Sequence, residues 1–334
     1  MKKKLENDDL LRFIETHDVL YIRHLMSSNM KAYGDLISNK IAAIHYQHDL
    51  KKDVDRAVLD NHKNYKNYKP RSYGRAAIKR LVDYSDKGAI VVADYTSSYY
   101  TGSKPKNPKT INIGILRPKT TVKVERYEPE SDEREKYKYG LIYKQVALEN
   151  VVPLGQTDCA LLLAIHPRGN TVVHWEEGEE AIKFIYKRTK GLKLEPSELS
   201  FKTLFPAQQE VLCSEYLRLK GSRESRLKYL LLPVGRGMKS LDIFGSNERK
   251  LVLGQVSSTT KEKDIEEKIE SLRSAIAQAD LKKKVVKVYF GPENENVEKI
   301  VRQKDPYLKF ISLDKVFEEM KGIGILEDML GVEF

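Results

Sequence analysis

The residues whose types and spacing best suit chemistry lie in one stretch of two expected strands, residues 240–258, SLDIFGSNERKLVLGQVSS. Asp242 stands in the first strand, and Gln255 and Ser257 stand at the end of the second. A hairpin brings side chains of adjacent strands to within about 5 Å of each other, so we expect Asp242 and Gln255 to reach one pocket. Carboxylate and amide oxygens are ligands that Mg²⁺ accepts beside substrate phosphates. The stretch therefore suggests a divalent-metal site.

Helices and strands alternate around this hairpin and would hold it in place. The sequence predicts helices at 206–220, 261–279 and 312–320, a short strand within 228–235, and a buried strand at 285–291. In the second helix, Ile265, Ile269, Leu272 and Ile276 form an apolar stripe at helical spacing. This mixture of helices and strands favours an α/β layer fold.

The order of these elements resembles the core of the PD-(D/E)xK restriction-endonuclease-like superfamily over about residues 203–320. In that superfamily a helix bears a Glu, one hairpin strand bears an Asp, and the next strand bears a (D/E/Q)-x-K. Glu210, Asp242 and Gln255 occupy these positions, although Glu215 competes with Glu210 on the same helix. The resemblance implies a mixed sheet flanked by helices and hydrolysis of DNA with Mg²⁺ or Mn²⁺. It also implies that these three residues are metal ligands and catalytic residues.

Ser257 departs from the superfamily pattern, which has a lysine at this position. Lysine roles in the superfamily can move to a neighbouring helix, and Lys261 and Lys268 at the start of helix 261–279 are the candidates. Three functions stay open: an active nuclease of the restriction or phage-defence type, a catalytically inactive nucleic-acid-binding or regulatory protein on the same fold, and an assembly subunit with a basic face for a partner protein.

The first half of the chain has a different pattern. Strands are expected at 89–95, 111–116, 120–127, 139–148 and 171–175, and helices at 74–88 and 176–188. The succession of strands suggests a small curved sheet or barrel. A domain boundary is expected within TKGLKLEPSELS, residues 189–200, which gives a two-domain α+β or α/β protein with domains 1–196 and 197–334.

This half resembles the PUA-like group of small barrels, including EVE-type domains, in its element order and apolar pattern. The resemblance implies a reader of a modified base that is flipped out of the duplex and stacked on aromatic rings. The alternative for each tyrosine is a place at the edge of the core. The candidate stacking residues are Tyr46, Tyr95, Tyr99, Tyr100 and Trp175.

Charge and composition favour a polyanionic partner. The chain carries 59 Lys and Arg against 48 Asp and Glu, a net charge of +11, which suits DNA, including modified or phage DNA. The segment DNHKNYKNYKPRSYGR, residues 60–75, mixes tyrosines with basic residues, and its alternative is a solvated loop. Its candidate phosphate contacts are Lys63, Lys66, Lys69 and Arg71.

Other features limit the class of protein. No glycine-rich phosphate loop is present, so any translocation along DNA would need a partner ATPase. The sequence also leaves open whether the protein forms a homodimer. No apolar run suits a membrane span, and the only two cysteines, Cys159 and Cys213, suit a reducing compartment. We expect a cytoplasmic protein.

The basic segment yields a test. Replacing Lys63, Lys66 and Lys69 together with Ala should lower the slope of log affinity against log salt by about 0.9 for each lost phosphate contact on duplex DNA. Equilibrium binding measured over a salt series checks this, and an unchanged slope would make the segment a solvated tether.

Overall fold

The computed structural model describes residues 7–24, 30–45, 72–95, 110–128, 141–155, 158–159, 162, 167, 171–195, 199–231, 241–278 and 284–331. The chain divides into two compact units, residues 1–194 (unit 1) and 195–334 (unit 2). This division lies two residues before the end of the first domain expected from the sequence. Both units mix helices and strands, so the protein is of mixed α and β structure.

A five-stranded sheet with the order β7-β4-β3-β1-β8 forms the centre of unit 1. β1 and β3 are parallel, and the other neighbouring pairs are antiparallel. β3 and β4 are buried along their whole length, as expected for strands covered on both faces. The strands are β1 (Val19–Arg23), β3 (Ala89–Asp94), β4 (Ile111–Leu116), β7 (Glu149–Pro153) and β8 (Val172–His174).

A second, three-stranded antiparallel sheet packs in the same core. It has the order β2-β6-β5, with β2 (Ile41–His45), β5 (Lys123–Tyr127) and β6 (Leu141–Ala147). The chain passes from β6 through Leu148 into β7, so consecutive strands belong to the two sheets. In unit 1 the chain passes between the two sheets four times, from β1 to β2, β2 to β3, β4 to β5 and β6 to β7. Closure of the two sheets into a PUA-like barrel stays a prediction.

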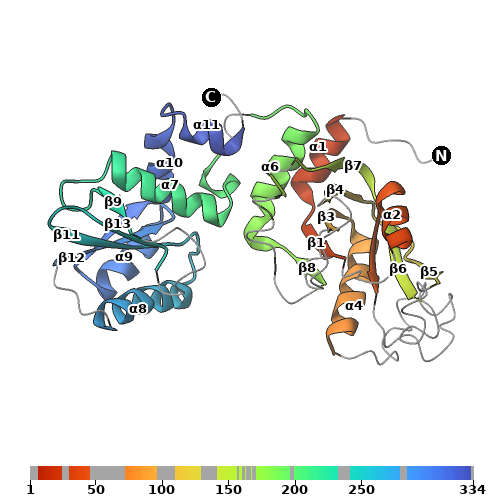
Figure 1. The fold of residues 1–334 in the computed structure, drawn as a ribbon, viewed down its shortest axis with the longest axis horizontal. Helices are drawn as coiled ribbons and strands as arrows, with labels where there is room; N and C mark the ends of the chain where they lie inside the picture. Colours follow the sequence, from red (N-terminus) through yellow and green to blue (C-terminus); the bar gives the residue numbers. More distant parts are fainter. Residues whose placement is uncertain are drawn as a thin grey trace. The chain divides into compact units, whose positions relative to one another are not determined.

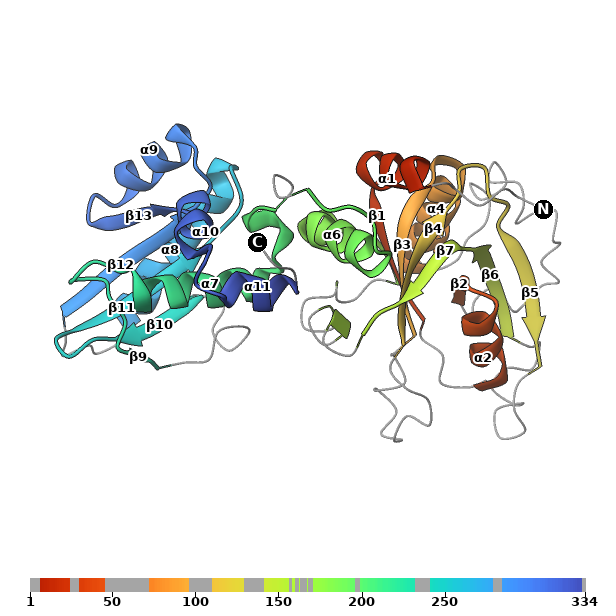
Figure 2. The ribbon, with the colours of Figure 1, turned by 90° about the horizontal axis from the view of Figure 1, so that it is seen from above.

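Helices cover the two faces of the five-stranded sheet (Figure 2). α1 (Asn7–Thr16) and α6 (Glu179–Thr189) contact each other on one face. A 3₁₀ turn at Glu176–Gly178 directly precedes α6. On the other face, α4 (Ser72–Lys87) packs in the hydrophobic core that lies between the five-stranded and the three-stranded sheets. α2 (Met30–Ser38) contacts β2. This arrangement brings the start of β1, the end of β8 and the start of α6 together.

Unit 2 is a five-stranded mixed sheet with the order β13-β12-β11-β10-β9. β9, β10 and β11 form an antiparallel meander, and β11, β12 and β13 are parallel. The strands are β9 (Tyr229–Leu230), β10 (Ile243–Ser246), β11 (Lys250–Val256), β12 (Lys284–Gly291) and β13 (Leu308–Ser312).

Two pairs of helices lie on opposite faces of this sheet (Figure 1). α8 (Glu262–Gln278) and α9 (Glu295–Lys304) contact each other on one face, and α7 (Pro206–Leu219) and α10 (Leu313–Met320) contact each other on the other. The expected stripe is real, because Ile265, Ile269 and Leu272 are buried against β11 and β12. A 3₁₀ turn at Phe201–Thr203 and α11 (Ile325–Leu330) complete the unit.

Among the described residues, no helix has the length and apolar character needed to cross a membrane.

Gly245 in β10 tests how closely the meander packs. A Cβ at this position would lie 2.5 Å from Leu227 Cδ2 and 2.7 Å from the Tyr229 carbonyl oxygen. Gly245→Ala should therefore destabilise unit 2 by about 1–3 kcal/mol through overpacking. Hydrogen exchange of the β10 and β11 amides in the full chain measures this locally.

The matched control is Gly155→Ala, because a Cβ at Gly155 would meet nothing within 4 Å. Equal protection of β10 in both variants would contradict the packing described for Gly245.

Candidate active site

Asp242 is positioned by an irregularity at the start of β10. Ile243 pairs with Gly254, and the backbone amide of Asp242 also donates to the Gly254 carbonyl at 3.1 Å. Two successive residues therefore oppose one, as in a β-bulge, a feature that re-aims side chains next to active sites. The Asp242 carboxylate accepts a hydrogen bond from the Val256 amide at 2.8 Å, which holds it at the end of β11.

Lys268 of α8 reaches the same end of the sheet. Its ammonium lies 3.6 Å from Asp242 Oδ2 and donates to the Val256 carbonyl at 2.6 Å. Val256 thus binds Asp242 through its amide and Lys268 through its carbonyl. A lysine from the helix therefore stands beside the acidic residue of the hairpin.

Glu210 approaches from α7, on the other face of the sheet. The pKa of Glu210 is raised to about 7, first by burial and then by the nearby charge of Asp242, while the charge of Lys268 lowers it. Glu210 Oε2 is buried without a hydrogen-bond partner. An acidic oxygen that is buried, unpartnered and close to a second carboxylate is typical of a functional site.

Gln255 and Ser257 flank Val256 and are both buried. Strand alternation puts Gln255 on the face of Leu251 and Leu253, which pack against α8. Ser257 donates its backbone amide to the Phe290 carbonyl at 3.0 Å. Burial raises the pKa of Tyr289, whose hydroxyl lies beside Ser257, to about 12. The position of the expected strand lysine is therefore filled by a small, enclosed side chain.

Lys261, the other lysine considered from the sequence, has a different setting. It is exposed just before α8, and its backbone amide is bound to the Thr259 hydroxyl at 3.1 Å. Of the two lysines, Lys268 is the one whose ammonium lies beside Asp242. Glu215, the competitor of Glu210, pairs with Arg218 at 2.5 Å along the outside of α7.

The two described aromatic candidates of unit 1 are core residues. Tyr95 is 2% exposed, donates its hydroxyl to the Ile41 carbonyl and stacks on His24, with ring centroids 4.1 Å apart. Trp175 is 4% exposed and meets Tyr21 edge-on. Both rings are covered by protein, which supports packing roles rather than stacking on a flipped base. The remaining candidates lie outside the described residues: Tyr46, Tyr99, Tyr100, Lys63, Lys66, Lys69 and Arg71.

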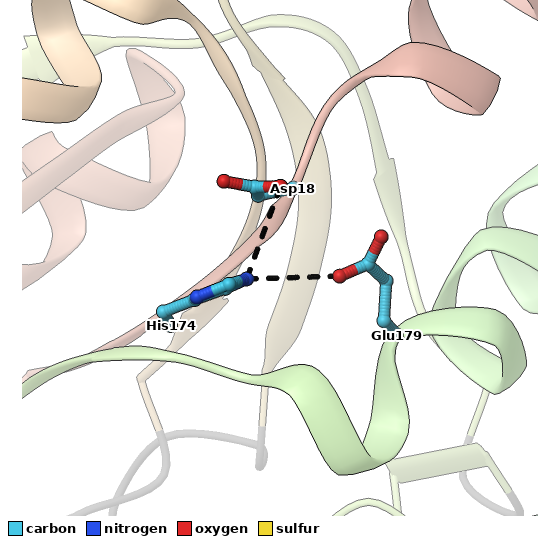
Figure 3. Close-up of side chains that lie close together, drawn as sticks. All are labelled: Asp18, His174 and Glu179. Carbon is cyan, nitrogen blue, oxygen red and sulfur yellow. Dashed lines mark ion pairs between the residues drawn. The ribbon is translucent and has the colours of Figure 1, made fainter.

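Unit 1 also holds a group that sequence reasoning missed, formed by Asp18, His174 and Glu179 (Figure 3). One ligand atom from each lies within 4.8 Å of the others. Asp18 precedes β1, His174 ends β8 and Glu179 begins α6. The pairing of β1 with β8 brings them together. Because Asp18 is far from His174 and Glu179 in the sequence, no short motif predicts the group.

Comparisons of the chain with protein-family models, with curated proteins and with solved structures found no match.

Glu210 gives the site a measurable pH dependence. Its pKa is 4.5 in the unfolded chain and about 7 in the folded protein, so between these values the folded state binds more protons. Stability should therefore fall as the pH rises from 4.5 to 7. Glu210→Gln should remove this loss, so that the variant gains on the order of 2–3 kcal/mol relative to wild type between pH 4.5 and pH 8. Urea unfolding at both pH values measures it.

Glu215→Gln is the matched control on the same helix and should keep the wild-type slope. Parallel pH profiles of wild type and Glu210→Gln would contradict a raised Glu210 pKa.

Proposed function

We propose that the chain is a metal-dependent phosphodiester hydrolase acting on DNA, of the restriction or phage-defence type, with unit 2 as a restriction-endonuclease-like domain. The observation that carries the proposal is the ammonium of Lys268 at 3.6 Å from Asp242 Oδ2, at the end of the hairpin. Lys268 would thus replace the lysine that the superfamily pattern has at the position of Ser257. The element order of unit 2 and its mixed sheet support the resemblance on which the proposal rests.

The donor set fits a hard divalent cation such as Mg²⁺ or Mn²⁺. Glu210 and Asp242 would hold it, since two neighbouring carboxylates destabilise each other until a cation binds between them. The unpartnered Oε2 of Glu210 is the oxygen that such an ion would satisfy. Gln255 as a further, neutral ligand stays a prediction, since strand alternation puts it on the face that packs against α8, whereas Glu210 approaches from α7.

A bound metal ion of this class polarises the scissile phosphate and lowers the pKa of water. The protein's own residues would do the rest. Asp242 is fixed by the Val256 amide, so its carboxylate is oriented before substrate arrives. Lys268 is held by the Val256 carbonyl and would donate to the attacking water or to the charge that develops on the phosphate.

A basic cavity in unit 2 supports a polyanionic substrate. It has a volume of about 500 Å³ and is lined by Arg223, Arg226, Lys228 and Arg249 together with Glu248, which pairs with Lys228. It lies at the turn of the β10–β11 hairpin, about 13 Å along the strands from Asp242. Arginine side chains there would contact phosphates away from the cleaved bond.

The proposal extends to unit 1 as a DNA-reading domain for modified or phage DNA. Its support is the net charge of +11 and the basic tyrosine-rich segment, residues 60–75. Tyr95 and Trp175 are left out of the reading surface because both are buried.

A second candidate is a catalytically inactive DNA-binding protein on the same fold. One observation favours it: Asp242 and Lys268 are both hydrogen-bonded to the backbone of Val256, an arrangement that stabilises the strand end without any chemistry. The neutral Gln255 and Ser257 suit this candidate as well.

Cleavage assays separate the two candidates. With Mg²⁺ or Mn²⁺, the purified full chain should cleave DNA, and Asp242→Ala should lose at least about 100-fold in rate because a metal ligand is removed. Lys268→Ala should lose about 10²–10³-fold, the usual effect of removing one preorganised donor, while its DNA affinity stays close to wild type. Modified phage DNA is assayed beside unmodified DNA.

Lys261→Ala is the matched control, since it removes the same charge from the start of the same helix and should cleave like wild type. If no metal supports cleavage of either DNA while Asp242→Ala still binds DNA normally, the inactive candidate is correct.

A further inference from the structure

We propose that Asp18, His174 and Glu179 of unit 1 form a binding site for one Zn²⁺ ion. This site is separate from the candidate nuclease site of unit 2 and does not depend on the function proposed there. It combines an imidazole nitrogen with two carboxylate oxygens on three different elements of the fold.

The inward atoms of the three side chains face one another (Figure 3). His174 Nε2 lies 3.9 Å from Asp18 Oδ1 and 3.7 Å from Glu179 Oε2. Ligands of a tetrahedral zinc ion, each about 2.0–2.1 Å from the metal, lie about 3.3 Å apart. A contraction of about half an ångström would bring His174 Nε2 to this spacing from each oxygen. The Asp18 and Glu179 oxygens, which lie within 4.8 Å of each other, would approach each other as well. Asp18 can supply this movement, because its side chain is 51% exposed.

A second observation concerns His174 Nε2 itself. This nitrogen is buried and has no hydrogen-bond partner, although it points between two carboxylates. A buried polar atom without a partner is costly unless an ion or water satisfies it. Its distances to both oxygens are longer than those of hydrogen bonds, so a metal ion between them would satisfy all three atoms.

The outward atoms of the same side chains are already held by neighbours. The Tyr84 hydroxyl donates to Asp18 Oδ2 at 3.1 Å, and the Lys183 ammonium binds Glu179 Oε1 at 2.6 Å. The other ring nitrogen of His174 lies 3.5 Å from Glu176 Oε1. Such outer partners orient the ligands of metal sites and leave one atom of each for the ion.

The donor set selects the kind of ion. Mg²⁺ and Ca²⁺ prefer sites made only of oxygen, whereas one imidazole with two carboxylates suits Zn²⁺. Three protein ligands leave a fourth position open, and the exposed side of Asp18 gives the ion a path from solvent. The ion would tie the start of β1, the end of β8 and the first turn of α6 together.

Zinc binding to the purified full chain tests the proposal. All proteins carry Asp242→Asn and Glu210→Gln, so that the unit 2 carboxylates do not contribute. After chelation and reloading, titration calorimetry and metal analysis should give one Zn²⁺ per chain, and Zn²⁺ should raise the Tm. Glu179→Gln and Asp18→Asn should each weaken Zn²⁺ binding at least 100-fold and lose the Tm shift. Tyr84→Phe should weaken it about tenfold, as loss of an outer partner does.

Glu180→Gln is the matched control, because Glu180 is the exposed neighbour of Glu179 in the same helical turn and carries the same charge. It should bind Zn²⁺ like the parent. Circular dichroism verifies that each variant is folded. Zn²⁺ affinity that is equal in Glu179→Gln, Asp18→Asn and Glu180→Gln, or absent from the parent, would overturn the proposal and leave the three residues as a network of ion pairs only.

Discussion

The candidate site of unit 2 depends on the bulge at Asp242. Asp242 and Ile243 both oppose Gly254, and this pairing is close, since a Cβ at Gly254 would lie 3.2 Å from Ile243 Cβ and its neighbours would have to move by a few tenths of an ångström. The bulge frees the Asp242 carboxylate from the regular alternation of the strand. The Val256 amide donates a hydrogen bond to it, so the acidic residue is held by the backbone of the neighbouring strand.

The position of Lys268 follows from the same backbone. The Val256 carbonyl binds its ammonium, and Val256 lies between Gln255 and Ser257, where the superfamily pattern has its acidic residue and its lysine. The proposed chemistry would need a positive charge near Asp242, and a strand or a helix could supply one. Here Ser257 is enclosed beside Tyr289, and the ammonium near Asp242 comes from the helix. A sequence motif thus describes one route to an arrangement that the fold can reach by another.

Much of unit 2 was predictable because its signals are local. The apolar stripe of α8 and the β-branched run of β12 gave elements within one residue of those observed, and β11 ends two residues before the expected end of its strand. α9 and β13 were missed, since α9 is polar over most of its surface and β13 has five residues. Asp242, Glu210 and Lys268 could be named as candidates, but their contact depends on a bulge and on helix packing, which no spacing encodes. The burial of Tyr95 and Trp175 agrees with the alternative that aromatic residues at strand ends belong to the edge of the core.

The pair Glu210 and Asp242 in unit 2 and the pair Asp18 and Glu179 in unit 1 each place carboxylates close together, and their surroundings stabilise them in different ways. In unit 2 the charge of Lys268 partly offsets the charges of Glu210 and Asp242, yet the pKa of Glu210 stays raised, mainly by burial. A cation that prefers oxygen ligands would stabilise both carboxylates in their ionised form. In unit 1 Tyr84 and Lys183 bind the outer oxygens of Asp18 and Glu179, and an imidazole faces the inner ones. The first group therefore favours a hard ion and the second a softer one. The two proposed sites differ in ligand chemistry: one has oxygen ligands alone, and the other has an imidazole nitrogen beside two carboxylates.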